Sequence, residues 1–141
     1  MDGGAHIALL RSSPAVANAV VYGVPVTAGG YPNDITIGPD GELWFAYTNA
    51  MQVGRITTTG SASVVPVPAA VSTIGAIATG PDGALWLTDD PDNSIQRIAT
   101  SGAVTTYALP TGTNALSGPL GIAAGPDVRS GLRRAMTAIS S

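Results

Sequence analysis

The residues best suited to chemistry lie in one short acidic run, Asp89-Asp90-Pro91-Asp92-Asn93-Ser94. Oxygen-bearing side chains occupy its second, fourth and sixth positions, as they do at the start of a calcium-binding loop. The glycine and the distant glutamate of such a loop are missing, because those positions hold Ile95 and Ser101. Asp, Pro and Asn are also the residues that an ordinary turn prefers. The run therefore predicts a turn, with a metal site at Asp90 and Asp92 as the alternative.

The chain has one histidine, His6, and no cysteine. Disulfides, thiolate metal sites and cysteine nucleophiles are therefore excluded. A lone histidine with no sequence motif around it is typical of an idle, exposed side chain. Paired carboxylates for acid–base catalysis, a Ser-His-Asp set and zinc-ligand spacing are all missing from the sequence. Gly3-Gly4 and Gly29-Gly30 lack the strand-to-helix context of a phosphate-binding loop. The residues alone thus predict no catalytic and no cofactor-binding site.

Composition narrows the class of protein further. The 141 residues suffice for one domain with a real core, and only 11% of them are charged, with a net charge of −3. The six Arg and no Lys provide no basic stripe, which argues against a nucleic-acid partner. No apolar run is long enough to cross a membrane. The apolar stretch Ile7–Leu10 follows Asp2 and no basic residue, unlike a secretory signal, so a cytoplasmic location is favoured.

A repeated heptapeptide, Gly-Pro-Asp-Gly-x-Leu-Trp, organises the elements that must position these residues. With an offset of 42, 11 of the 31 residue pairs starting at Gly38 and ending at Pro68 are identical. A third copy begins at Gly125-Pro126-Asp127, after a step of 45. A period of about 40–45 residues with several short strands is typical of propeller blades. The structural positions shared by both full copies are Gly38, Pro39, Asp40, Gly41 and Trp44, then Gly80, Pro81, Asp82, Gly83 and Trp86.

The sequence predicts an all-β fold, an incomplete β-propeller of about three four-stranded antiparallel blades, two complete and two partial. Residues 1–13 are poorly defined, and the repeats occupy 14–127, with full blades near 34–68 and 76–110. Ala15–Pro25 resembles the outer strand of a preceding blade, and Ile7–Leu10 is a candidate for its third strand. The expected strands of the repeats are about 34–37, 42–47, 52–58, 63–67, 76–79, 84–88, 94–99, 104–109 and 120–124.

The repeated residues have packing roles in this architecture. Pro and Gly in the heptapeptide predict a type I turn followed by a left-handed glycine. A Trp present in every full repeat is typical of a large filler between neighbouring blades, the alternative being a ligand-pocket wall. Arg55 and Arg97 are expected to bridge to turn carboxylates, the alternative being contact with a ligand.

The tail after Asp127 departs from the repeat, which predicts Gly-x-Leu-Trp there. Instead, residues 128–141 contain three of the six arginines. One back-translation of this tail, read with one additional G before it, gives Gly-Ala-Leu-Trp-Phe at the register that the repeat requires. A one-base deletion is therefore our hypothesis for this anomalous segment. The alternative is a short amphipathic helix from Gly131 to Ile139 that caps the open edge.

The quoted repeat, together with Val/Ile-x-Arg-Ile-x-Thr-x-Gly and a strand that closes on Leu-Pro or Val-Pro, resembles the repeats of streptogramin lyase (virginiamycin B lyase) proteins. The resemblance covers roughly residues 15–127. It implies a seven-bladed propeller and a magnesium-dependent elimination that opens the ester of a cyclic depsipeptide, with a histidine base near acidic residues and the metal. Magnesium is implied only in this way.

This chain departs from that family pattern in two respects. It holds about three blades, and His6 lies outside the matched region, so no catalytic residue can be transferred to it. The first interpretation is a streptogramin lyase-like propeller fragment that is inactive alone. The second is a binding or scaffold propeller whose unidentified small-molecule or peptide ligand lies at loops such as 47–51 and 89–93. The third is a half-propeller that closes by self-association through its open blade faces, since soluble monomers seldom expose large apolar patches.

Overall fold

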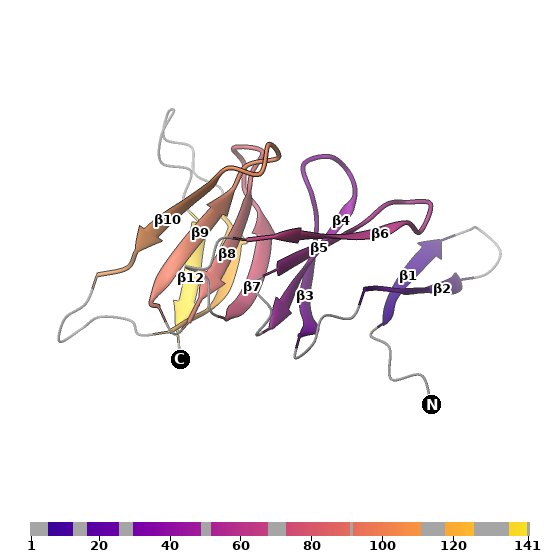
Figure 1. Ribbon diagram of the computed structural model, residues 1–141, viewed down its shortest axis with the longest axis horizontal. Helices are drawn as coiled ribbons and strands as arrows, with labels where there is room; N and C mark the ends of the chain where they lie inside the picture. Colours follow the sequence, from indigo (N-terminus) through magenta and orange to yellow (C-terminus); the bar gives the residue numbers. More distant parts are fainter. Residues whose placement is uncertain are drawn as a thin grey trace.

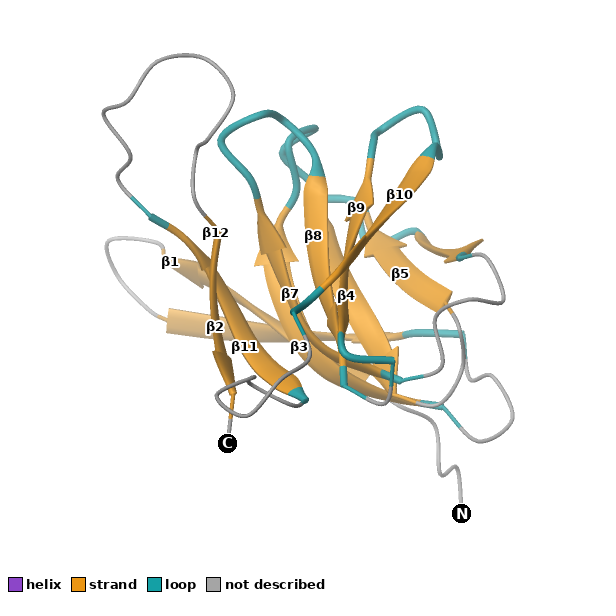
Figure 2. Cartoon of the chain, turned by 90° about the vertical axis from the view of Figure 1, so that its left-hand side faces the viewer, coloured by secondary structure: helices purple, strands orange, loops and turns teal. Residues whose placement is uncertain are grey.

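A computed structural model describes residues 6–12, 17–25, 30–48, 52–67, 73–90, 92–110, 118–125 and 136–140, and the side chains of those that lie within 21–125. All regular structure in these ranges is β-strand, as Figure 2 shows. Within them, no helix is long and apolar enough to span a membrane.

Four antiparallel sheets follow one another along the chain, and we name them blades 1 to 4. Blade 1 has β1 (His6–Ser12) and β2 (Ala17–Gly23); blade 2 has β3 (Tyr31–Ile37), β4 (Leu43–Thr48), β5 (Gln52–Ile56) and β6 (Ala62–Pro66). Blade 3 has β7 (Ile74–Thr79), β8 (Leu85–Asp89), β9 (Ser94–Ile98) and β10 (Val104–Ala108); blade 4 has β11 (Pro119–Ala124) and β12 (Met136–Ser140). In Figure 1 the sheets succeed one another from blade 1 near the N-terminus to blade 4 near the C-terminus. The predicted all-β fold with two complete and two partial blades is confirmed.

The heptapeptide forms the turn between the first two strands of each full blade. The amide of Gly41 donates to the carbonyl of Gly38 at 3.0 Å, and the amide of Gly38 donates to the carbonyl of Glu42 at 2.7 Å. Gly41 has a φ of 79°, a left-handed conformation that a residue with a Cβ adopts only at a cost. The same two bonds recur in blade 3, where Gly83 has a φ of 71°. The predicted turn with a left-handed glycine is thus confirmed in both copies.

The first glycine of the heptapeptide is required by packing. A Cβ built on Gly38 would lie 2.1 Å from the indole of Trp44, and one on Gly80 would lie 2.4 Å from the indole of Trp86. Real Cβ atoms do not approach other atoms so closely, so the indole lies against the bare backbone of the turn. The heptapeptide is therefore one packing unit, which explains why glycine and tryptophan recur together.

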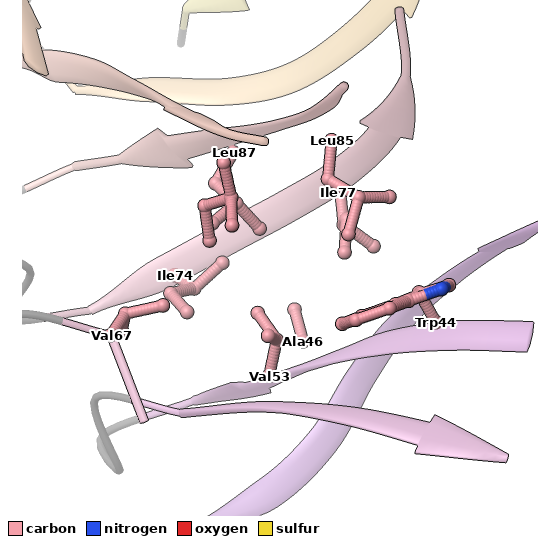
Figure 3. Packing of buried hydrophobic residues seen from close by; sticks show 9 residues of the cluster. Trp44, Ala46, Val53, Val67, Ile74, Ile77, Leu85 and Leu87 are labelled. Atoms are coloured by element: carbon pink, nitrogen blue, oxygen red, sulfur yellow. The ribbon is translucent and has the colours of Figure 1, made fainter. Parts of the chain in front are cut away.

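The main core lies between blades 2 and 3. Trp44, Ala46 and Val53 project from blade 2 toward Ile77, Leu85 and Leu87 of blade 3, as Figure 3 shows. Trp44 is only 7% exposed and packs between the two neighbouring blades. A second cluster joins blade 1 to blade 2, with Val24, Phe45, Tyr47 and Ile56 as its buried members.

The inner strands of neighbouring blades lie side by side, β3 beside β7 and β7 beside β11. Side-chain hydrogen bonds link the first pair. The Asn33 amide donates to the carbonyl of Gly75 at 2.6 Å, and the amide of Ile77 donates to the Asp34 carboxylate at 2.9 Å. The hydroxyl of Thr79 donates to the carbonyl of Ile37. These bonds hold the two inner strands in a fixed register.

Both ends of the chain form two-stranded sheets. β1 and β2 contain the two segments predicted for the preceding blade, and β11 contains the predicted 120–124 strand. The alternative helix in the tail is wrong over 136–139, because β12 is extended and pairs with β11, with Ala138 opposite Ile122. A strand at this position pairs its backbone with β11, whereas an isolated helix of about nine residues is only marginally stable in water. The deletion hypothesis stays a prediction, which sequencing of the locus tests.

Candidate functional site

The most concentrated polar cluster of blade 2 surrounds the turn aspartate. The indole nitrogen of Trp44 donates to Asp40 at 3.0 Å, and the guanidinium of Arg55 approaches the same carboxylate at 3.1 Å. Arg55 also pairs with Glu42, and its guanidinium carbon lies 5.5 Å from the centre of the Trp44 ring. The predicted ion pair between Arg55 and a turn carboxylate is present. The second ion pair, with Glu42, could not be predicted from the repeat, because the corresponding residue of blade 3 is Ala84.

Blade 3 repeats the cluster with fewer members. The Trp86 indole donates to Asp82 at 3.0 Å, and Arg97 pairs with Asp82 at 2.6 Å. Trp86 also stacks on Tyr107, with ring centres 5.5 Å apart and planes 19° from parallel. The repeat identifies Asp82, Trp86 and Arg97, because each has an identical counterpart in blade 2. It does not identify Tyr107, whose counterpart is Val65.

The two turn carboxylates are held in their charged forms. Burial works to raise the pKa of Asp40, but the Trp44 indole, the amide of Glu42 and the nearby Arg55 outweigh it and lower that pKa below its usual range. The same opposition lowers the pKa of Asp82, where burial is outweighed by bonds from Trp86 and Arg97. A carboxylate with a lowered pKa is a poor proton acceptor at neutral pH. These bonds give each turn carboxylate structural partners within its own blade.

A cavity of about 400 Å³ lies between blades 2 and 3 at the end where these turns lie. Asp40, Trp44 and Arg55 form one wall, and the turn from Ala99 to Gly102 forms part of the other. Its size falls in the range of small-molecule pockets, which runs from roughly 300 to 1,000 Å³. Because successive antiparallel strands reverse direction, this end is opposite to the loops that follow β4 and β8. The predicted ligand loops 47–51 and 89–93 therefore belong to the other end, and residues 49–51 and 91 lie outside the described part.

The acidic run forms a turn. The amide of Asn93 donates to the carbonyl of Asp90 at 3.1 Å, and Asn93 adopts a left-handed φ of 46°. Asp90 and Asp92 are exposed. Among the described residues, no three His, Asp or Glu side chains gather as metal ligands would. The metal alternative at Asp90 and Asp92 stays a prediction, and so does the absence of a catalytic role for His6, which begins β1 and whose side chain lies outside the described part.

A buried polar group in blade 3 was not expected from the sequence. The Gln96 amide donates to Ser94 at 3.1 Å and its carbonyl accepts from Thr106 at 2.6 Å, and the hydroxyl of Thr88 accepts from the amide of Ala76 at 2.9 Å. The signal was available in the offset of 42, since Gly54 and Ala46 of blade 2 become Gln96 and Thr88. Gln96 thus bonds to two side chains of its own sheet and Thr88 bonds to a backbone amide, so these buried polar groups stabilise the blade.

The fold and the repeated turn cluster together define a partial β-propeller, whose two full blades each carry the heptapeptide turn 42 residues apart. The model of the virginiamycin B lyase family matches residues 15–130. The chain belongs to that family.

Solved structures agree with this assignment. A streptogramin B lyase is 32% identical with a TM-score of 0.78, and the match covers 99% of this chain and 42% of that one. Virginiamycin B lyase from Staphylococcus aureus is 28% identical with a TM-score of 0.74, covering 96% of this chain and 48% of that one. A catalytically inactive histidine-to-alanine variant of the same enzyme, with quinupristin, matches equally well. The comparison with curated proteins gave no match. The chain thus spans less than half the length of the solved lyases it matches.

Proposed function

We propose that the chain is a segment of a streptogramin lyase-like propeller and that it has no lyase activity alone. The observation that carries the proposal is the family match over residues 15–130 combined with coverage of only 42% and 48% of the related lyases. Elimination requires a base next to the reacting proton. The S. aureus enzyme is inactive when one histidine becomes alanine, and the single histidine here, His6, precedes the matched region.

The placement of the carboxylates supports the same conclusion. Asp40 and Asp82 are bound by indole and guanidinium groups, and Asp34 accepts the amide of Ile77. Each of these carboxylates therefore has a structural partner.

The test is a turnover assay with quinupristin and Mg²⁺, in which mass spectrometry follows the opened ring. Virginiamycin B lyase from S. aureus serves as the positive control. We expect no opened product from the 141-residue chain at an enzyme concentration equal to that of the antibiotic. Turnover above the rate without protein, abolished by His6→Ala, would show that the chain is itself a lyase.

A binding function is the second candidate, and the cavity between blades 2 and 3 favours it. Trp44 lines that cavity and Trp86 does not, and they are the two tryptophans of the chain. In a Trp86→Phe variant, fluorescence reports on Trp44 alone. Saturable quenching by quinupristin without turnover would support a binding propeller; no change up to millimolar concentration would exclude quinupristin as a ligand of this cavity.

A further inference from the structure

The outer strands of blades 1, 2 and 3 differ at one equivalent position. Val65 of β6 lies 42 residues before Tyr107 of β10. Tyr22 of β2 lies two residues before Val24, as Val65 lies two residues before Val67. Both Val24 and Val67 are buried against the following blade, so the two strands have the same alignment. The position therefore holds a tyrosine in blades 1 and 3 and a valine in blade 2.

The two tyrosine rings at this position cover two kinds of surface. Tyr22 lies over the turn at Gly60 of blade 2, where a built Cβ would be 2.1 Å from the ring. Tyr107 stacks on Trp86 of its own blade, with ring centres 5.5 Å apart. A ring at this position can thus contact the turn glycine of the next blade and the tryptophan of its own blade.

In blade 2 the shorter valine leaves a cavity where such a ring would lie. Gly102, the counterpart of Gly60, has no atom of the described residues within 4 Å of a built Cβ. Trp44, Val65 and Gly102 all line the cavity of about 400 Å³ between blades 2 and 3. An engineered apolar cavity of about 150 Å³ is large enough to bind benzene. This cavity therefore has room for a substituted aromatic ring.

The walls of the cavity favour a neutral ring that carries a hydroxyl group. Val65 and Ile98 supply apolar surface. Arg55 pairs with Asp40 and Glu42. Because a guanidinium has five N–H donors, Arg55 can also donate to an oxygen of a ligand. The two carboxylates outnumber this one cation, so an anionic ligand would be repelled.

We propose that the cavity between blades 2 and 3 binds a neutral phenolic ring of a small molecule, which takes the place of the tyrosine that blade 2 lacks. The ring contacts Trp44 as Tyr107 contacts Trp86, and it covers Gly102 as Tyr22 covers Gly60. The residues that line the cavity belong to the two full blades. The inference does not depend on lyase activity, and it stands whether or not quinupristin enters this cavity.

The probe is para-cresol, which reproduces the side chain of tyrosine. The chain has two tryptophans, so NMR spectra of the isotope-labelled protein contain two indole N–H signals, which a Trp86→Phe variant assigns. Titration with para-cresol should shift the Trp44 signal saturably, with a Kd of roughly 1 mM, as expected for so small a ligand. The Trp86 signal should move much less. Absence of a saturable Trp44 shift up to about 10 mM would overturn the proposal.

Two further ligands test the chemical class. Methylcyclohexanol keeps the substituents of para-cresol but lacks the flat aromatic face, so it should bind about three- to tenfold more weakly. The anion para-toluate keeps the flat ring but carries a negative charge, and the carboxylates beside Arg55 should weaken its binding as well. Equal affinity for methylcyclohexanol would disprove the preference for an aromatic ring. Affinity for para-toluate equal to that for para-cresol would disprove the preference for a neutral one.

A pair of variants in β6 tests the location of the site. Val65→Tyr should fill the cavity with a ring of the chain itself and abolish the para-cresol shift of Trp44, while an unchanged Trp86 signal reports that the variant is folded. Val64→Tyr is the matched control, because Val64 is 37% exposed and points to the other face of the sheet. It should bind para-cresol as the unaltered chain does. Unchanged binding by the folded Val65→Tyr variant, or equal loss in both variants, would show that the site does not lie beside Val65.

Discussion

Blades 2 and 3 have the same turns but different interiors. Both contain the bonded Asp–Trp–Arg cluster, and both close their first turn with a left-handed glycine. Inside the sheets, the cross-strand pair Phe45–Gly54 of blade 2 becomes Leu87–Gln96 in blade 3. A Cβ on Gly54 would lie 1.9 Å from the Phe45 ring, so the large ring requires the bare glycine. A smaller side chain at Leu87 leaves room for Gln96. The two full repeats therefore share their turns, whereas the side chains of this interior pair differ.

The neighbours of the two blades differ as well. Trp44 packs into the core between blades 2 and 3, whereas Trp86 remains half-buried beside the two-stranded blade 4. The same residue at the same repeat position therefore contributes differently to stability. What a blade residue contributes depends on the blade next to it, as in other repeat proteins.

The largest expected effect comes from removing a blade tryptophan. Trp44→Ala should lower the free energy of unfolding by about 3–5 kcal/mol, the usual cost of a buried aromatic. Trp86→Ala should cost about half as much, because less of its surface is withdrawn from water. Urea denaturation of both variants measures the difference. Equal costs would mean that Trp86 is covered as well as Trp44, and would sharpen the case for a further blade beside it.

The next effect tests the exchanged pair. Gly54→Ala should cost about 2–3 kcal/mol of stability, because the new methyl group meets the Phe45 ring. Adding Phe45→Leu should recover part of that loss, since leucine lacks the ring atoms that make the clash. A double-mutant cycle in urea gives the coupling between the two sites.

Gly23→Ala is the control for this cycle. A Cβ at Gly23 has no atom within 4 Å, so this variant should change stability by less than about 0.5 kcal/mol. If Gly54→Ala lowered stability by no more than Gly23→Ala, the inference that the Phe45 ring requires glycine at position 54 would be wrong.

A smaller difference is expected between the two arginines. Arg55 pairs with Asp40 and Glu42 and lies over Trp44, whereas Arg97 pairs with Asp82. Both are partly exposed, so their ion pairs are each worth about 0–1 kcal/mol. Arg55→Ala should be the more harmful of the two, and high salt should narrow the gap because it screens exposed charges. A larger loss from Arg97→Ala would contradict this order.

The smallest effect is the dependence of stability on acid. The pKa values of Asp40 and Asp82 are lowered in the folded chain, so the stability they confer is present above the unfolded value of about 3.9 and is lost as pH falls through the folded values. Thermal melts from pH 6 to pH 2.5 should show part of the loss below pH 4. Asp40→Asn should flatten this part of the profile, and an unchanged profile in both Asn variants would assign the acid sensitivity to other groups.

The sequence by itself determined the local chemistry of this protein. The heptapeptide predicted the turn, the left-handed Gly41 and the bridge from Arg55, because each depends on residues close to one another in a hairpin. The period predicted the order of the strands in blades 2 and 3, and the residues of the motif predicted the family. β12 was not predicted, because the tail departs from the repeat. Within the acidic run, turn residues predicted the turn that forms at Asn93.

Only the tertiary structure decided what depends on neighbouring blades. The burial of Gln96, the stacking of Tyr107 and the exposure of Ile35 all depend on which side chains lie across a sheet or an interface. A period of 42 residues assigns Ile35 and Ile77 the same position, yet one is covered and the other is exposed. The physical reason is that a side chain is buried only when a second surface packs against it. The repeat specifies the blade that carries the side chain and not the surface that packs on it.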